Sequence, residues 1–244
     1  MSHIQTPVYV SYEKVSRAGI ARACSNEFPS PRPWEAPPRR RWPFVVLALV
    51  VVAAVLFTWG LAHASSAVAA PYLSDSPSTW RAGHVPALYQ TDPQWADEPY
   101  AGATIGSSGC GPTCLAAVAI ALTGNESLTP PVVAAYSEGN GHVDDGLTAW
   151  TLMTDGARGL GLDGREEPAT VEAVTGALEA GRPVIASMGP GDFTSTGHFI
   201  VLTSLGTDGT VHVMDPNSQP RTRQGWDLAQ VLGQARGLWS FSAA

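Results

Sequence analysis

The C-terminal part of the chain predicts an α+β fold, with helices first and an antiparallel sheet after them. Helix-starting and helix-ending residues frame four stretches between residues 110 and 180. After residue 184 the pattern changes to short runs rich in Val, Ile and Leu, separated by turn-forming residues. A doubly wound parallel sheet would alternate strands and helices throughout, so we expect an antiparallel meander instead.

The first predicted helix covers residues 110–123. Pro112 fits only the first turn of a helix, and the alanine-rich run after it favours helix formation. Gly124 and Asn125 end this helix. The same kinds of signal predict three further helices at residues 130–137, 148–158 and 171–180, with Thr129 and Thr170 as N-caps and Gly181 as a stop.

Three strands are predicted after the helices, at residues 184–188, 198–203 and 211–215. A glycine-rich loop separates the first two, and Asp208-Gly209 predicts a hairpin turn between the second and third. Upstream of the helices, residues 85–90 predict a short extended segment that runs into the turn-forming sequence Asp92-Pro93-Gln94-Trp95.

The N-terminal part predicts a tail, a membrane span and a linker. Residues 1–43 are rich in proline and basic residues and are typical of a disordered tail. Residues 44–62 carry no charge and would span ~28 Å as a helix, close to the thickness of a bilayer core. Residues 63–80 are rich in serine and proline and predict a flexible linker, so the folded domain covers residues 81–244.

The basic cluster Arg39-Arg40-Arg41 places the tail in the cytoplasm and the C-terminal domain outside the cell. We therefore expect a single-pass protein of the cell membrane, anchored through residues 44–62. The alternative is secretion after signal cleavage, because Ala62-His63-Ala64 fits a cleavage site. A signal peptide usually has a shorter apolar region of about 7–15 residues, which favours the anchor.

Charge argues against nucleic acid as a partner. The net charge is −7, and the part after residue 63 has seven arginines against eighteen acidic residues. His142, Asp144 and Asp145 lie close together, but their spacing fits neither a zinc site nor an EF-hand. We expect a solvated loop there, and no metal or other cofactor.

Cys110 is the candidate nucleophile, because it lies between two glycines at the start of the first predicted helix. A helix terminus contributes ~0.3–1 kcal/mol, less than the roughly 1.4 kcal/mol of one pKa unit, so a thiolate there also needs a cationic partner. Cys114 lies one turn later and is expected in the core. Cβ atoms at this spacing are ~5–6 Å apart, too far for a disulfide.

His198 and Asp215 complete a candidate triad. His198 begins one strand and Asp215 ends the next, so pairing across the hairpin brings the two side chains together within a residue or two of register. A carboxylate beside an imidazole fixes its tautomer and supports its protonated form.

The run from Gly109 to Ala116, followed by Gly197-His198-Phe199-Ile200-Val201 and then Asp215-Pro216, resembles the cysteine peptidases that remove double-glycine leaders in bacteriocin exporters, in their stand-alone secreted form. The segment Gln90-Thr91-Asp92-Pro93-Gln94-Trp95 resembles the opening segment of that form. The resemblance covers residues 85–216. It implies a papain-like fold, with Cys110 as nucleophile, His198 as general base and acid, and Asp215 as orienting residue.

The resemblance also implies a glutamine that donates to the oxyanion together with the backbone N–H of the nucleophile. In exporter-linked members it lies six residues before the cysteine, where this chain has Thr104, so Gln90 is the expected substitute. We therefore expect hydrolysis of a peptide or protein substrate through a Cys110 thioester. Two alternatives remain open: a non-catalytic module that binds a peptide or cell-wall component, and an acyltransferase with an amine as acceptor.

Overall fold

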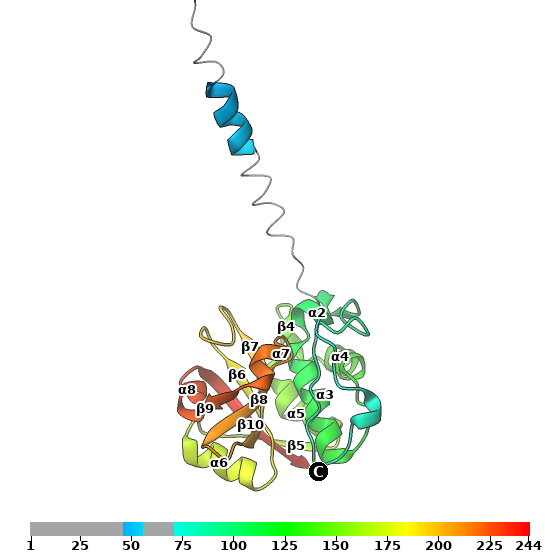
Figure 1. Ribbon diagram of the computed structural model, residues 1–244. Helices are drawn as coiled ribbons and strands as arrows, with labels where there is room; N and C mark the ends of the chain where they lie inside the picture. Colours follow the sequence, from blue (N-terminus) through cyan, green and yellow to red (C-terminus); the bar gives the residue numbers. More distant parts are fainter. Residues whose placement is uncertain (1–45, 56–70) are drawn as a thin grey trace, which may run out of the picture. The chain divides into compact units, whose positions relative to one another are not determined.

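The computed structural model describes residues 46–55 and 71–244 (Figure 1). The predicted tail 1–43 lies outside the described residues, and the predicted span 44–62 and linker 63–80 lie partly outside them. Residues 46–55 are helical, and no helix in the described ranges is both long and apolar enough to cross a bilayer. The chain divides into two units after Ala67, and the second contains the sheet.

The sheet of the second unit is antiparallel and has the strand order β5-β10-β6-β7-β8-β9. Strands β6 to β9 form a meander, while the C-terminal strand β10 inserts between β5 and β6 (Figure 1). The strands are β5 Leu162–Glu166, β6 Val184–Met188, β7 His198–Leu205, β8 Thr210–Met214, β9 Gly225–Asp227 and β10 Ala235–Ala243.

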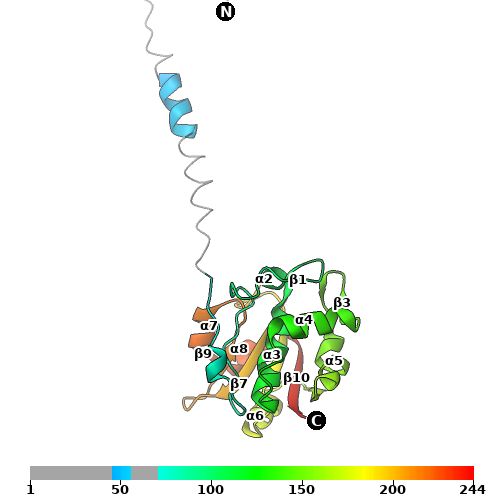
Figure 2. The ribbon, with the colours of Figure 1, turned by 90° about the vertical axis from the view of Figure 1, so that its right-hand side faces the viewer.

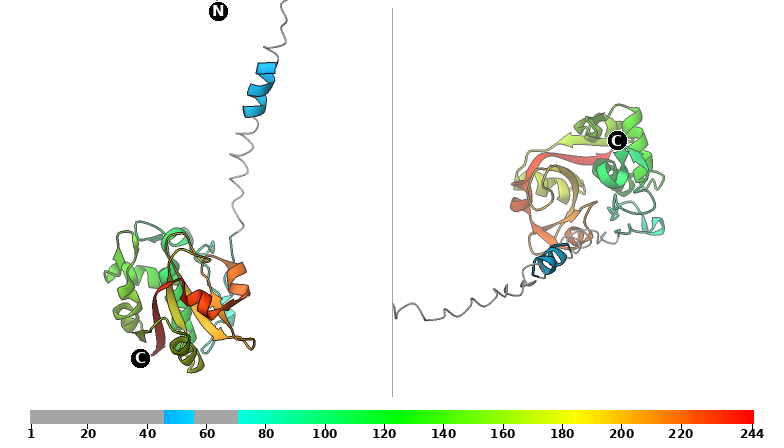
Figure 3. Two further views of the ribbon diagram at one scale, coloured as in Figure 1. Left: turned by 90° about the vertical axis from the view of Figure 1, so that its left-hand side faces the viewer. Right: turned by 90° about the horizontal axis from the view of Figure 1, so that it is seen from above.

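Both faces of the sheet are covered, because side chains alternate between two hydrophobic clusters along each central strand. In β7, Phe199 and Val201 face the cluster around helix α3 (Cys110–Thr123), while Ile200 and Leu202 face the other one. Helices α6 (Val171–Glu179) and α8 (Leu228–Leu232) supply the second cover (Figure 3).

Helix α3 is the central helix of the unit and packs between the sheet and α4 (Pro130–Gly139) (Figure 2). Its side chains are buried from Gly111 to Ala121, which explains why an alanine-rich helix with no polar face is stable here. The remaining short elements are η1 Pro77–Thr79, β1 Pro99–Tyr100, β2 Ala103–Thr104, α2 Ile105–Ser108, β3 Val143–Asp144, β4 Leu147–Thr148, η2 Trp150–Met153, α5 Asp155–Gly159 and α7 Gln219–Arg223.

Three of the four predicted helices are present. Helix α3 has the predicted bounds, and Gly124 follows it in the left-handed conformation with φ 67°. Helix α6 begins after Thr170, whose side chain accepts from the Ala173 N–H. Helix α4 begins after Thr129, but that side chain makes no capping hydrogen bond, and the helix continues to Gly139.

The predicted helix at 148–158 is wrong. Thr148 belongs to the β3–β4 hairpin, whose turn residues Asp145 and Gly146 both have positive φ, as a type I′ turn requires. The Thr148 hydroxyl also hydrogen-bonds the buried Tyr100 hydroxyl at 2.8 Å, which holds this residue in the hairpin. The stretch after it forms η2 and α5 instead of one helix.

The meander is confirmed, with β6 at its predicted bounds and a turn at Asp208-Gly209. Strands β5, β9 and β10 were not predicted. The expectation of all helices before the sheet is wrong, because β5 precedes α6, and α7 and α8 follow β8 and β9. Strand β5 has the polar sequence of an edge strand. Strand β10 has no clear alternation of buried and exposed residues, because its middle, from Leu238 to Phe241, is buried throughout.

Candidate active site

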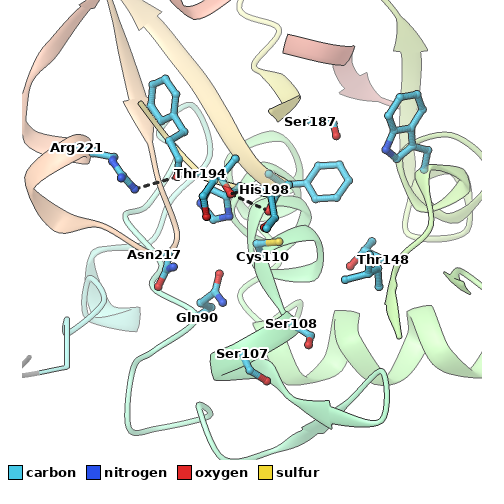
Figure 4. A pocket seen from close by; sticks show the side chains of 17 residues that line it. Gln90, Ser107, Ser108, Cys110, Thr148, Ser187, Thr194, His198, Asn217 and Arg221 are labelled. Carbon is cyan, nitrogen blue, oxygen red and sulfur yellow. Dashed lines mark hydrogen bonds between the residues drawn. The ribbon is translucent and has the colours of Figure 1, made fainter. Parts of the chain in front are cut away.

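The position of Cys110 follows from the glycines around it. Cys110 is the first residue of α3, and Gly109 separates this helix from the short α2. A Cβ on Gly111 would lie 2.6 Å from the Thr148 side chain, so only glycine allows α3 to come this close to the β3–β4 hairpin. Cys110 is partly exposed and lines a cavity (Figure 4).

His198 and Asp215 form the hydrogen bond expected across the hairpin. His198 is the first residue of β7, and Asp215 directly follows β8. The imidazole Nε2 donates to the Asp215 Oδ1 at 2.7 Å, and the carboxylate is fully buried. The other ring nitrogen, Nδ1, is therefore the one available to the Cys110 thiol.

Asp215 has two further partners. The Asn217 backbone N–H donates to Oδ1 at 2.8 Å, and Arg221 Nη1 donates to Oδ2 at 3.2 Å. Arg221 also donates to the Phe193 carbonyl, so it joins the carboxylate to the loop before β7. Arg221 is not among the residues predicted for the site. The available signal was Ser218, two residues after Pro216, which caps the short helix α7 that brings Arg221 back toward the carboxylate.

The charge state of His198 follows from three competing influences. Burial alone would lower its pKa, because the interior disfavours the charged ring. Hydrogen bonds and electrostatic interactions with Asp215 and Cys110 outweigh burial and raise the pKa of His198 from 6.5 to about 9. The imidazole is thus protonated at neutral pH and stabilises negative charge on the neighbouring sulfur.

Gln90 reaches the same cavity, whereas Thr104 does not line it. The Gln90 side chain is buried, and its Nε2 donates to the Gly106 carbonyl at 2.9 Å, which leaves the amide a second N–H. Its Oε1 has no hydrogen-bond partner among the described residues. Of the two positions considered for an oxyanion donor, only Gln90 therefore lines the cavity that Cys110 lines.

The cavity has a volume of about 800 Å³ and lies between the start of α3 and one end of the sheet (Figure 4). Hydroxyl and aromatic side chains dominate its lining, and none of the described acidic side chains contributes to it. The lining residues are Gln90, Ser107, Ser108, Cys110, Leu147, Thr148, Trp150, Ser187, Phe193, Thr194, Ser195, Thr196, Gly197, His198, Phe199, Asn217 and Arg221.

Residues 83–239 match the family model described as the Peptidase_C39 like family. The chain belongs to the C39-like peptidase family. No curated protein matches it. A solved structure from Bacillus anthracis, described as a candidate C39-like peptidase, is 14% identical, with a TM-score of 0.40 over 66% of this chain and 96% of the other.

The second cysteine of the C39-like domain has a different environment from the first. Cys114 is fully buried in the core, as expected, and burial raises the pKa of its thiol well above the ordinary value. Cys110 and Cys114 both carry free thiols. Of these two, only Cys110 reaches the cavity.

The loop before β3 differs from its prediction. His142 is largely buried, its ring stacks on Tyr136, and its Nδ1 hydrogen-bonds the Thr151 hydroxyl at 2.9 Å. The expectation of a solvated histidine is therefore wrong, while Asp144 and Asp145 are exposed. Within the described part of the C39-like chain, no cluster of three or more His, Cys, Asp or Glu side chains could hold a metal.

Proposed function

We propose that this protein is an exported, stand-alone cysteine peptidase that hydrolyses peptide bonds through a thioester on Cys110. The observation that carries the proposal is the hydrogen bond of 2.7 Å between buried His198 and Asp215, in the same cavity as Cys110 at the start of a helix. Nucleophile, base and orienting carboxylate are the three groups that acyl transfer by a cysteine requires.

In the proposed reaction, the Cys110 thiolate attacks the scissile carbonyl and forms a tetrahedral intermediate. The Cys110 backbone N–H and the Gln90 amide donate to its oxyanion. Protonated His198 then gives its proton to the departing amine, and a thioester remains. Neutral His198 takes a proton from water, the resulting hydroxide attacks the thioester, and the acid product leaves with Cys110 restored.

Export rests on the sequence. The uncharged run 44–62 after the basic cluster supports either an anchor in the cell membrane or a signal that is cleaved, and both put the domain outside the cell. Intact masses of cell-associated and released protein distinguish the two. A released protein with the mass of a chain that begins after Ala64 would show cleavage. A protein of full-length mass in the membrane fraction would show the anchor.

The reactivity of the thiols tests the nucleophile. We expect iodoacetamide at pH 6 to label Cys110 at least ~10-fold faster than Cys114, because the first is next to protonated His198 and the second is buried with a raised pKa. Peptide mapping by mass spectrometry measures both rates. The His198→Ala variant is the control, in which the rate at Cys110 should fall and the rate at Cys114 should not.

Equal and slow labelling of both thiols would contradict an activated nucleophile. Where Cys110 is labelled, a cysteine-directed peptidyl inhibitor should form an adduct at the same residue. Product analysis with an added amine then distinguishes hydrolysis from acyl transfer. If the wild type shows no turnover and the Cys110→Ala variant still binds peptide, the protein is a non-catalytic module.

A further inference from the structure

Asp92 is a buried ionisable residue that the proposed reaction does not use. It lies two residues after Gln90, and its side chain is completely buried. The Ser74 backbone N–H donates to Oδ2 at 2.6 Å, and the Gln94 backbone N–H donates to Oδ1 at 3.0 Å. The carboxylate therefore joins the turn after Gln90 to the segment at the start of the folded unit.

Asp92 also organises the turn through its backbone. The Asp92 N–H donates to the Tyr89 carbonyl at 3.0 Å, and the Asp92 carbonyl accepts from the Trp95 N–H at 3.0 Å. The Trp95 indole N–H donates to the same Tyr89 carbonyl at 2.8 Å. The residues on either side of Gln90 are thus fixed by a turn that Asp92 closes.

Gln90 in turn joins the two walls of the cavity. Its backbone N–H donates to the Pro216 carbonyl at 2.8 Å, directly after Asp215, and its side chain donates to the Gly106 carbonyl at 2.9 Å, just before Cys110. A displacement of Gln90 would therefore disturb its contacts on both sides of the nucleophile.

The contact with Gly106 relates the two proposed oxyanion donors to each other. As the first residue of α3, Cys110 has a backbone N–H with no acceptor inside that helix. Gly106 lies four residues earlier, so its carbonyl is the acceptor that an unbroken helix would offer to that N–H. Gln90 donates to this carbonyl, so the Gln90 amide is anchored on the peptide group that an unbroken helix would pair with the Cys110 N–H.

We propose that Asp92 is a positioning residue for the oxyanion site, which it holds in place through Gln90. The inference rests on the proposed function. A carboxylate suits the role because it only accepts hydrogen bonds, and both of its oxygens face backbone N–H groups. In Asp92→Asn one oxygen becomes an NH₂ group that faces a donor, with almost no change in size.

The test compares Asp92→Asn with Asp97→Asn in the full chain, because Asp97 is an exposed carboxylate in the same segment. The probe is an internally quenched peptide that contains a Gly-Gly pair. We expect Asp92→Asn to lower kcat by about 10- to 100-fold, with KM within about twofold, because a misplaced donor weakens binding of the transition state. Asp97→Asn should match the wild type.

Alkylation distinguishes positioning from a general loss of structure. Iodoacetamide forms no oxyanion, so the rate at Cys110 should be the same in Asp92→Asn and the wild type. Asp92→Glu keeps the carboxylate and should recover part of kcat. The proposal is overturned if kcat is unchanged in Asp92→Asn, or if kcat and the alkylation rate fall together.

If the wild type cleaves no peptide, the proposed function is wrong. NMR then tests separately whether Asp92 holds Gln90 in place. Hydrogen exchange of the Gln90 side-chain amide should then be about tenfold faster in Asp92→Asn than in Asp97→Asn, because the Gly106 contact opens more often. Equal exchange in the two variants would overturn the role of Asp92.

Discussion

At the scale of single residues, the site depends on how a buried imidazole keeps its proton. Burial of His198 favours the neutral ring, yet Asp215 on one side and Cys110 on the other favour the charged one, and the pKa rises to about 9. Arg221 pairs with the same carboxylate, so Asp215 is not left as a single buried charge. In the proposed reaction, the proton that the leaving amine needs is therefore already present on His198 at neutral pH.

This raised pKa predicts a loss of stability at alkaline pH. The folded state binds the His198 proton more tightly than the unfolded state does. The contribution of this proton to the free energy of unfolding is therefore complete below about pH 6.5 and is lost as the pH rises through about 9. Urea unfolding from pH 6 to 10 should show a steeper decrease in unfolding free energy for the wild type than for His198→Ala. Identical pH dependence in the two proteins would contradict the stabilised imidazolium.

At the scale of elements, helix α3 holds Cys110 at the cavity because glycines determine where the helix packs at its start and where it ends. Gly111 permits contact with Thr148 at the start, and Gly124 adopts φ 67° at the end. Gly176, inside α6, has neither constraint, because a Cβ there would meet nothing within 4 Å. The three glycines therefore have different roles, which their identity in the sequence does not reveal.

Two alanine substitutions test this difference. Gly124→Ala should lower the free energy of unfolding by about 1–2 kcal/mol, because a side chain disfavours the left-handed conformation. Gly176→Ala should raise it by up to about 1 kcal/mol, because alanine is the better helix former. Thermal and urea unfolding measure both changes. A stabilising Gly124→Ala would show that the end of α3 does not need the left-handed conformation.

At the scale of the whole molecule, β10 joins the parts of the domain. It lies between β5 and β6, so the last strand of the chain completes the sheet on which α3 packs. Trp239 in this strand is buried, and its ring contacts Trp150 at the cavity and Phe199 next to His198. The C-terminal strand thus supports the site although it contributes no residue to the proposed reaction.

Removal of the Trp239 ring should therefore destabilise the whole unit. We expect Trp239→Ala to lower the unfolding free energy by about 3–5 kcal/mol, the usual result of deleting a large buried aromatic side chain. Trp150→Ala is the matched control, and its effect should be smaller because that ring is 47% exposed. Urea unfolding measures both, and equal losses would contradict a central role for β10.

Two features of the site follow from the amino-acid order alone, namely the start of α3 at Cys110 and the approach of His198 to Asp215. Both depend on local signals: glycine and proline at a helix start, and one hairpin turn that pairs neighbouring strands. Three other features became known only from the folded chain: β10 inserts beside β6, Arg221 returns to Asp215, and Gln90, not Thr104, reaches the cavity. These depend on contacts between segments distant in the chain or on the exact path of a loop, which the periodicity of hydrophobic residues does not encode.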